Sequence, residues 1–102
     1  MDAYKLLTLR KDGTLGPLFI GRRLVLPLGV PLQAQDIPTP GYAHRPGWHC
    51  LARPSAPHLA LRPNRVWASV SIEDFTCHLR PESQGGLWYL AQVMTITDIV
   101  ET

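Results

Sequence analysis

The sequence predicts a small α+β protein that is mostly β, built as one antiparallel sheet or a partly open barrel with one short helix. Its 102 residues are 45% apolar and only 18% charged, a composition that suits one globular core. Ten prolines and eight glycines interrupt any long helical periodicity. The apolar runs between them are short, which favours strands joined by turns. We therefore expect residues 1–102 to form a single domain.

The N-terminal half is predicted to begin with a β-hairpin. Asp12-Gly13 lies between two apolar runs, and this dipeptide is a strong hairpin signal. The second run contains Pro17 and is expected at a sheet edge, because proline donates no backbone hydrogen bond. Strands are expected over residues 4–10, 15–20, 22–28 and 32–35.

The clearest strand is predicted over residues 65–72. Apolar side chains alternate there, so one face of the strand is expected to be core. That face consists of Val66, Ala68, Val70 and Ile72. Residues 73–79 should extend this strand past a bend. A short helix is expected over 58–61, a loop over 80–86, and further strands over 48–53 and 87–100.

Charge is distributed unevenly along the chain. The formal net charge is +2, and Arg is more frequent than Lys. No Asp or Glu occurs between Asp36 and Glu73, so the middle third is locally cationic. A weak net charge with few lysines argues against binding to an extended nucleic-acid duplex.

Residues 41–61 combine arginine, histidine and aromatic residues with three prolines and no acid. Phosphate needs a fixed cation and bases need a stacking surface, so this composition suits an anionic ligand or an acidic partner surface. The alternative is that Trp48 and His58 anchor the loop in the core beneath solvated arginines. The candidate binding residues are Tyr42, His44, Arg45, Trp48, His49, Arg53, His58, Arg62, Arg65 and Glu82.

The two cysteines lie in the mirrored dipeptides His49-Cys50 and Cys77-His78. Adjacent residues on a strand point to opposite faces, so neither dipeptide should give two ligands to one metal. We expect no metal, no cofactor and no catalytic set, with both thiols reduced and buried.

The N-terminal residues indicate a cytoplasmic protein. Charges at Asp2, Lys5, Arg10 and Lys11 occupy the part where a signal peptide needs an apolar core. No apolar run approaches the roughly 18 to 20 residues of a membrane helix. No membrane partner is expected.

Five motifs are distributed along the chain between residues 13 and 90: GTLGPLFI (13–20), RPGWH (45–49), APHL (56–59), RVW (65–67) and RPESQGGLWYL (80–90). Together they resemble a family of small uncharacterised proteins of bacteriophages and prophages. The resemblance implies a bacterial mobile-element context and, by analogy, an accessory protein that acts against host defence, of the anti-CRISPR type. It implies no catalytic residue.

A fainter likeness connects residues 47–49, 57–61 and 66–72 with small ADP-ribosyltransferase-like folds. In those enzymes the catalytic glutamate usually lies on a late strand, whereas the candidate here, Glu82, lies in the predicted loop.

Two functions follow from these expectations. The first is a non-enzymatic inhibitor that binds directly to a bacterial defence or nucleic-acid-handling complex. The alternative is a nucleotide-binding protein, either a sponge for a small anionic signal or a transferase that uses NAD, with His44, Arg45, His49 and Glu82 in its pocket. Either protein could be a monomer or a homodimer.

Overall fold

The computed structural model describes residues 1–18, 24–34, 47–54 and 63–100, and the chain is mostly β. Within these residues six antiparallel strands form one sheet, as predicted. They are β1 (Asp2–Leu9), β2 (Leu15–Gly16), β3 (Pro31–Gln33), β4 (Trp48–Leu51), β5 (Arg65–Leu79) and β6 (Leu87–Ile99). Among the described residues the helical element is a single 3₁₀ turn, η1 (Glu82–Gln84). The helix predicted over 58–61 lies outside the described residues.

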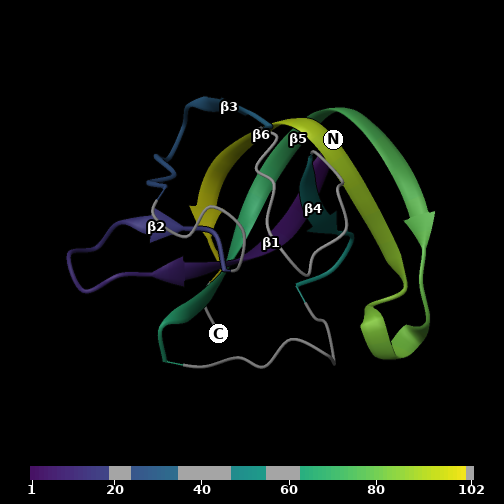
Figure 1. The fold of residues 1–102 in the computed structure, drawn as a ribbon, viewed down its shortest axis with the longest axis horizontal. Helices are drawn as coiled ribbons and strands as arrows, with labels where there is room; N and C mark the ends of the chain where they lie inside the picture. Colours follow the sequence, from purple (N-terminus) through teal and green to yellow (C-terminus); the bar gives the residue numbers. More distant parts are fainter. Residues whose placement is uncertain (19–23, 35–46, 55–62, 101–102) are drawn as a thin grey trace, which may run out of the picture.

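Four of the strands follow one another around a ring. β1 pairs with β5, β5 with β6, β6 with β4, and β4 again with β1. The last pairing consists of the single pair Tyr4 and Leu51, so the ring closes only narrowly there. β2 is added beside β1 and β3 beside β6 (Figure 1).

The predicted Asp12-Gly13 hairpin is confirmed. The Arg10 N–H donates to the Thr14 carbonyl at 2.9 Å, and Asp12 Oδ1 accepts from the Thr14 N–H at 3.0 Å and from its hydroxyl at 2.7 Å. These hydrogen bonds lower the pKa of Asp12. β2 is shorter than the predicted run and pairs only with β1 among the described strands, at an edge as expected.

The strand predicted over 22–28 is wrong for its described part. Residues 24–27 form no strand, and Leu28 makes only an isolated bridge to Ile96. The Leu24 carbonyl instead accepts from the guanidinium of Arg10, and the Leu26 N–H donates to the Leu15 carbonyl. These hydrogen bonds satisfy backbone groups of the segment without a strand ladder. The next predicted strand is confirmed in part as β3.

β5 and β6 form a long hairpin that bends at Asp74, where φ is 51°. Ile72 and Phe75 are successive inward residues on β5, three positions apart instead of two. Ala91 and Met94 show the same spacing on β6. The positions that face the core shift by one residue on both strands, so β5 and β6 keep the same residue pairing past the bend. The predicted bend is therefore confirmed, and the hairpin arches across the molecule with η1 near its tip (Figure 1).

Two apolar clusters form the core. The larger one lies inside the ring and contains the predicted Ala68, Val70 and Ile72, with Val66 packed against it. The smaller one lies on the opposite face of the strands and consists of Leu6, Leu51, Trp67 and Trp88. Both faces of the first half of β5 are thus covered, which is why Trp67 is also buried. No helix among the described residues has the length and apolar character needed to cross a membrane.

Candidate binding site

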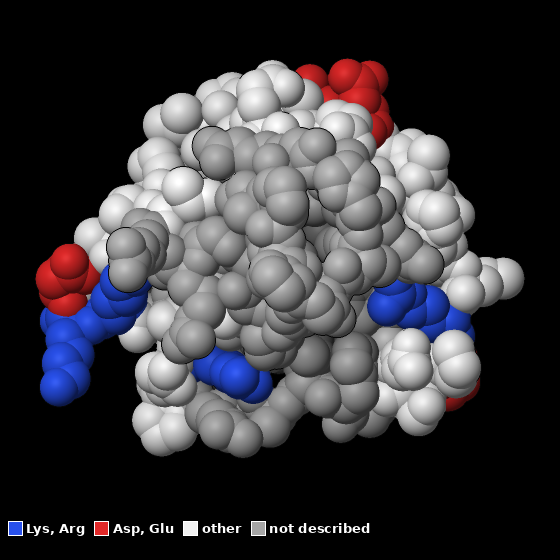
Figure 2. Space-filling model, in the orientation of Figure 1, with Lys and Arg blue, Asp and Glu red and all other residues white. Residues whose placement is uncertain are grey.

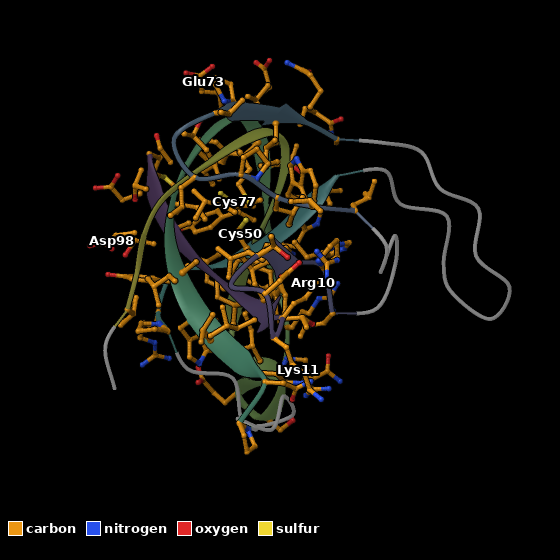
Figure 3. The ribbon with its side chains drawn as sticks, turned by 90° about the vertical axis from the view of Figure 1, so that its left-hand side faces the viewer. Arg10, Lys11, Cys50, Glu73, Cys77 and Asp98 are labelled. Carbon is orange, nitrogen blue, oxygen red and sulfur yellow. The ribbon has the colours of Figure 1, made fainter. Side chains whose placement is uncertain are left out.

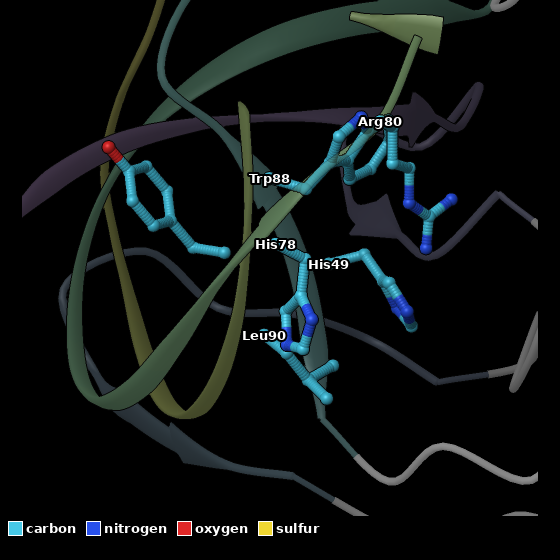
Figure 4. Close-up of a pocket in the computed structure, with 6 residues that line it drawn as sticks. His49, His78, Arg80, Trp88 and Leu90 are labelled. Carbon is cyan, nitrogen blue, oxygen red and sulfur yellow. The ribbon is translucent and has the colours of Figure 1, made fainter. Parts of the chain in front are cut away.

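A shallow groove lies on the outer face of β4, β5 and β6, near the tip of the hairpin. Leu51 and His78 are both register partners of Trp88, from opposite sides. His49 lies opposite Leu90 in the same way. Opposed residues of an antiparallel pair project from the same face, so these side chains share one surface. The groove has a volume of about 190 Å³ and is lined by His49, His78, Arg80, Trp88, Tyr89 and Leu90 (Figure 4).

The buried Trp88 side chain forms the floor of this groove. Its side chain is 6% exposed, and its Nε1 donates to the Gln84 carbonyl in η1. The guanidinium carbon of Arg80 lies 4.9 Å from the centroid of the indole. The His49 ring meets the same indole edge to face, with centroids 6.4 Å apart. Trp88 therefore holds a cation and an imidazole in fixed positions.

The outer rim is polar. His78 is exposed, and its Nε2 lies 2.8 Å from the hydroxyl of Thr76. Beside η1, Arg53 Nη2 and Glu82 Oε2 are 3.7 Å apart with both side chains highly exposed. An exposed pair of this kind adds little stability. Its charges are available to solvent and to a partner.

Gly47 allows β4 to lie against β6. Its φ is 145°, and a Cβ atom there would lie 2.6 Å from Cδ1 of Leu90. A side chain at this position would strain the backbone and displace Leu90. This close approach sets the position of His49, two residues further along β4.

Lys5 fixes β4 from inside the ring. It lies opposite Ala68 and so points inward, and its Nζ donates to the His49 carbonyl at 2.7 Å. Burial lowers the pKa of Lys5. Burial also raises the pKa of the nearby Cys50 thiol, while the Lys5 charge opposes that rise.

The sequence-predicted site residues take different places. His49 lines the groove, and Arg53 and Glu82 form the exposed pair beside η1. Trp48 lies in the core, where its Nε1 donates to the Leu32 carbonyl at 3.0 Å. Arg65 begins β5, at the end of that strand far from the groove. Five further candidates lie outside the described residues: Tyr42, His44, Arg45, His58 and Arg62.

Five residues that line the groove were not among the predicted binding residues: His78, Arg80, Trp88, Tyr89 and Leu90. A signal was present, since Thr76, His78 and Arg80 alternate along the chain. This alternation becomes informative only when residues 73–79 are paired as a strand with residues 87–91. The pairing then places Thr76 and His78 on the same face as Leu90 and Trp88.

The cysteines behave only partly as expected. Both are free thiols, and each dipeptide divides its side chains between two faces. Cys50 is buried in the core cluster inside the ring, but Cys77 is exposed and the expectation that it is buried was wrong. It follows the bend at Asp74, where β5 leaves β1. Within the described part of the chain, no three His, Cys, Asp or Glu side chains gather to hold a metal.

Charged side chains are dispersed over the described surface. In Figure 2 the described Lys and Arg side chains occur in separate places on the visible face. The acidic Glu73 and Asp98 lie apart from Arg10 and Lys11 in Figure 3.

No family model, curated protein or solved structure matches this chain. We therefore infer function from the groove. A guanidinium and two imidazoles around a buried indole can bind an anionic group beside an apolar one.

Proposed function

We propose that this protein acts by direct, non-enzymatic binding, and that the groove over Trp88 contacts a carboxylate-bearing surface of a partner protein. The observation that carries the proposal is the Arg80 guanidinium held 4.9 Å from the Trp88 ring centroid, with His49 and His78 beside it. Arginine and tryptophan are enriched among residues that dominate protein interfaces, and a guanidinium recognises a carboxylate through two parallel hydrogen bonds.

The size of the groove favours a protein surface over an enclosed small molecule. Its volume is about 190 Å³, whereas ligand pockets usually span about 300 to 1,000 Å³. This space fits one or two side chains of a partner. An acidic residue next to an apolar one matches the lining best, because Leu90 lies in the same groove as the Arg80 guanidinium.

The resemblance to phage and prophage proteins directs the choice of partner. In that context we expect a bacterial defence or nucleic-acid-handling complex, inhibited by occupation of an acidic surface in the manner of an anti-CRISPR protein.

Nucleotide binding is the second candidate, and the Arg80 guanidinium beside the two imidazoles favours it. The indole, however, is already covered by Arg80 and is only 6% exposed, so a base would have to displace the arginine to stack there. Glu82, the residue considered for transferase chemistry, lies exposed beside Arg53. The nucleotide-binding hypothesis therefore ranks below the protein-binding hypothesis.

Nuclear magnetic resonance titration of the isotope-labelled protein tests the proposal. The probes are an acetylated hexaglutamate peptide, inorganic phosphate, AMP and NAD, each at physiological salt. We expect the peptide to shift the Trp88 indole signal saturably and to bind more tightly than phosphate. Arg80→Ala should weaken peptide binding about tenfold or more, which corresponds to about 1.4 kcal/mol.

Lys11→Ala is the matched control, because it removes one positive charge at the exposed hairpin tip. Equal losses in both variants would reduce the effect to nonspecific attraction and contradict the proposal. No peptide-induced shift at millimolar concentration would also contradict it. Tighter saturation by NAD or AMP would replace it with the nucleotide function.

A further inference from the structure

The outer edge of β5 is open beyond its contact with β1. The β1 ladder reaches Ser71, and Met1 and Ile72 exchange the last hydrogen bonds. From there to Leu79, β5 has β6 on one side, and no strand among the described residues pairs with its other side. An open strand edge is a template for pairing with another chain.

The hydrogen-bond pattern identifies which backbone groups face outward. The Arg80 N–H donates to the Gly86 carbonyl at 2.8 Å, so position 80 faces the β6 side of the hairpin. Because the direction alternates along an antiparallel strand, Phe75, Cys77 and Leu79 direct their N–H and C=O groups away from β6. Cys77 is exposed and Leu79 is 87% exposed, so the edge is accessible.

We propose that residues 75–79 pair antiparallel with the same residues of a second copy of this chain, about a two-fold axis at Cys77. This register places Cys77 opposite its own counterpart and Phe75 opposite Leu79. In this register the three residues whose backbone groups point away from β6 all bond to the second copy. They form about six hydrogen bonds, two for each hydrogen-bonded residue pair. The inference concerns the edge of β5 rather than the groove and does not depend on the proposed function, although Arg80 lies at the end of both.

Charge complementarity argues that the partner of this edge is a second copy of the chain. Residues 75–79 contain no Asp, Glu, Lys or Arg, so the usual charged protection of an edge is absent. The segment is preceded by Asp74 and followed by Arg80. In the antiparallel register each Asp74 lies opposite the other chain's Arg80, whereas a parallel pairing would bring like charges together. The edge is therefore self-complementary, as a two-fold interface requires.

The pairing would also align the two grooves. Residues opposite each other in an antiparallel ladder project from the same face, and Thr76 would lie opposite His78 of the second copy. Both grooves would then open on one face of a continuous sheet.

Analytical ultracentrifugation of the full chain, from micromolar to sub-millimolar concentration, tests the proposal. We expect a reversible monomer–dimer equilibrium. Leu79→Lys should weaken dimerisation at least about tenfold, because it places a charge in the apolar part of the edge. Asp74→Asn should weaken it several-fold and reduce its salt dependence, and Asn tolerates the positive φ at this position.

Disulfide trapping gives a second readout that does not depend on these variants. The Cα atoms of a hydrogen-bonded pair lie about 5.5 Å apart, within the range of about 4.4 to 6.8 Å found for disulfides. Oxidised glutathione should link Cys77 to Cys77; each link releases two glutathione thiols, so electrons and protons balance. Cys77→Ser should abolish the link, and Cys50→Ser should leave it intact.

A monomer throughout the concentration range would overturn the proposal, as would trapping no faster for the native protein than for the urea-unfolded chain. Dimers that Leu79→Lys and Asp74→Asn leave unchanged would place the interface elsewhere and overturn it as well. Each variant is first compared with the native protein by circular dichroism, and the trapping result decides if a variant fails to fold.

Discussion

The Arg80 guanidinium carbon lies 4.9 Å from the centroid of the Trp88 ring, next to the turn of the β5–β6 hairpin. Arg80 follows the last residue of β5, and Trp88 is the second residue of β6. The turn between them is closed by the Arg80 N–H bond to the Gly86 carbonyl. One local hairpin thus supplies both the cation and the aromatic surface of the groove, and His49 is added from β4.

Loss of the Arg80 side chain should affect stability and binding differently. Arg80→Ala removes a cation–π contact, and the expected loss of unfolding free energy is about 0.5 to 1 kcal/mol. Arg80→Lys should recover most of this stability but not carboxylate binding, because an ammonium cannot make the two parallel hydrogen bonds of a guanidinium. Urea unfolding and the hexaglutamate titration measure the two effects. Full recovery of binding by lysine would contradict the bidentate contact.

Gly47→Ala should destabilise the fold by about 1 to 3 kcal/mol, because it combines backbone strain with a collision against Leu90. The collision follows from the 2.6 Å distance between a Cβ atom at Gly47 and Cδ1 of Leu90. Gly29→Ala is the matched control: its φ is also positive, at 75°, but a Cβ atom there has no neighbour within 4 Å.

Comparable losses of unfolding free energy in both glycine variants would mean that strain alone acts at Gly47. A larger loss at Gly47, together with altered His49 and Trp88 resonances, would support its role in positioning the groove.

Local signals in the sequence predict much of the sheet. The Asp12-Gly13 turn and the alternation in residues 65–72 depend on neighbours along the chain, and both predictions are confirmed. The change of phase at Asp74 was not predictable in detail. It depends on a positive φ that an aspartate adopts only occasionally, and it is matched by a change on β6.

The groove was predicted less completely than the sheet, because its residues come together through register. His49 was identified from a cationic, aromatic segment, but Trp88 and His78 join it only once β6 is paired with both β4 and β5. The composition of residues 41–61 left two roles open for Trp48, a binding residue or a core anchor, and strand alternation turns its ring into the core. A pattern along one segment cannot show which partner strand covers each of its faces.

The two thiols should react at very different rates. Cys77 is exposed, whereas Cys50 is 0% exposed and burial raises the pKa of its thiol. In the native protein at low micromolar concentration, a chromogenic disulfide reagent should titrate Cys77 rapidly and Cys50 only after unfolding by urea. Cys77→Ser is the diagnostic variant and should leave no fast phase. A fast phase that persists in Cys77→Ser would show that the ring opens readily around Cys50.

Removal of Lys5 should change how stability depends on pH. Burial disfavours the ammonium, so the folded-state pKa of Lys5 lies below its ordinary value of 10.5. Between these two pKa values the unfolded chain binds more protons than the folded chain, and stability therefore rises with pH in that window. Below the folded-state pKa, Lys5 is protonated in both the folded and the unfolded chain, so its burial lowers the unfolding free energy by an amount that does not change with pH. Lys5→Met lacks this contribution and also loses the bond to the His49 carbonyl.

Urea unfolding of both proteins from neutral pH to about pH 10.5 measures the difference, because the other titrating groups are common to the two chains. The unfolding free energy of the native protein relative to Lys5→Met should increase towards alkaline pH. Burial raises the folded-state pKa of Cys50, so the native protein loses stability as the thiol of the unfolded chain ionises, and the Lys5 charge changes this effect. The comparison is therefore made in a Cys50→Ala background, where the difference between the two chains reports Lys5 alone. Parallel pH profiles in that background would mean that the Lys5 ammonium is as well solvated in the folded chain as in the unfolded one.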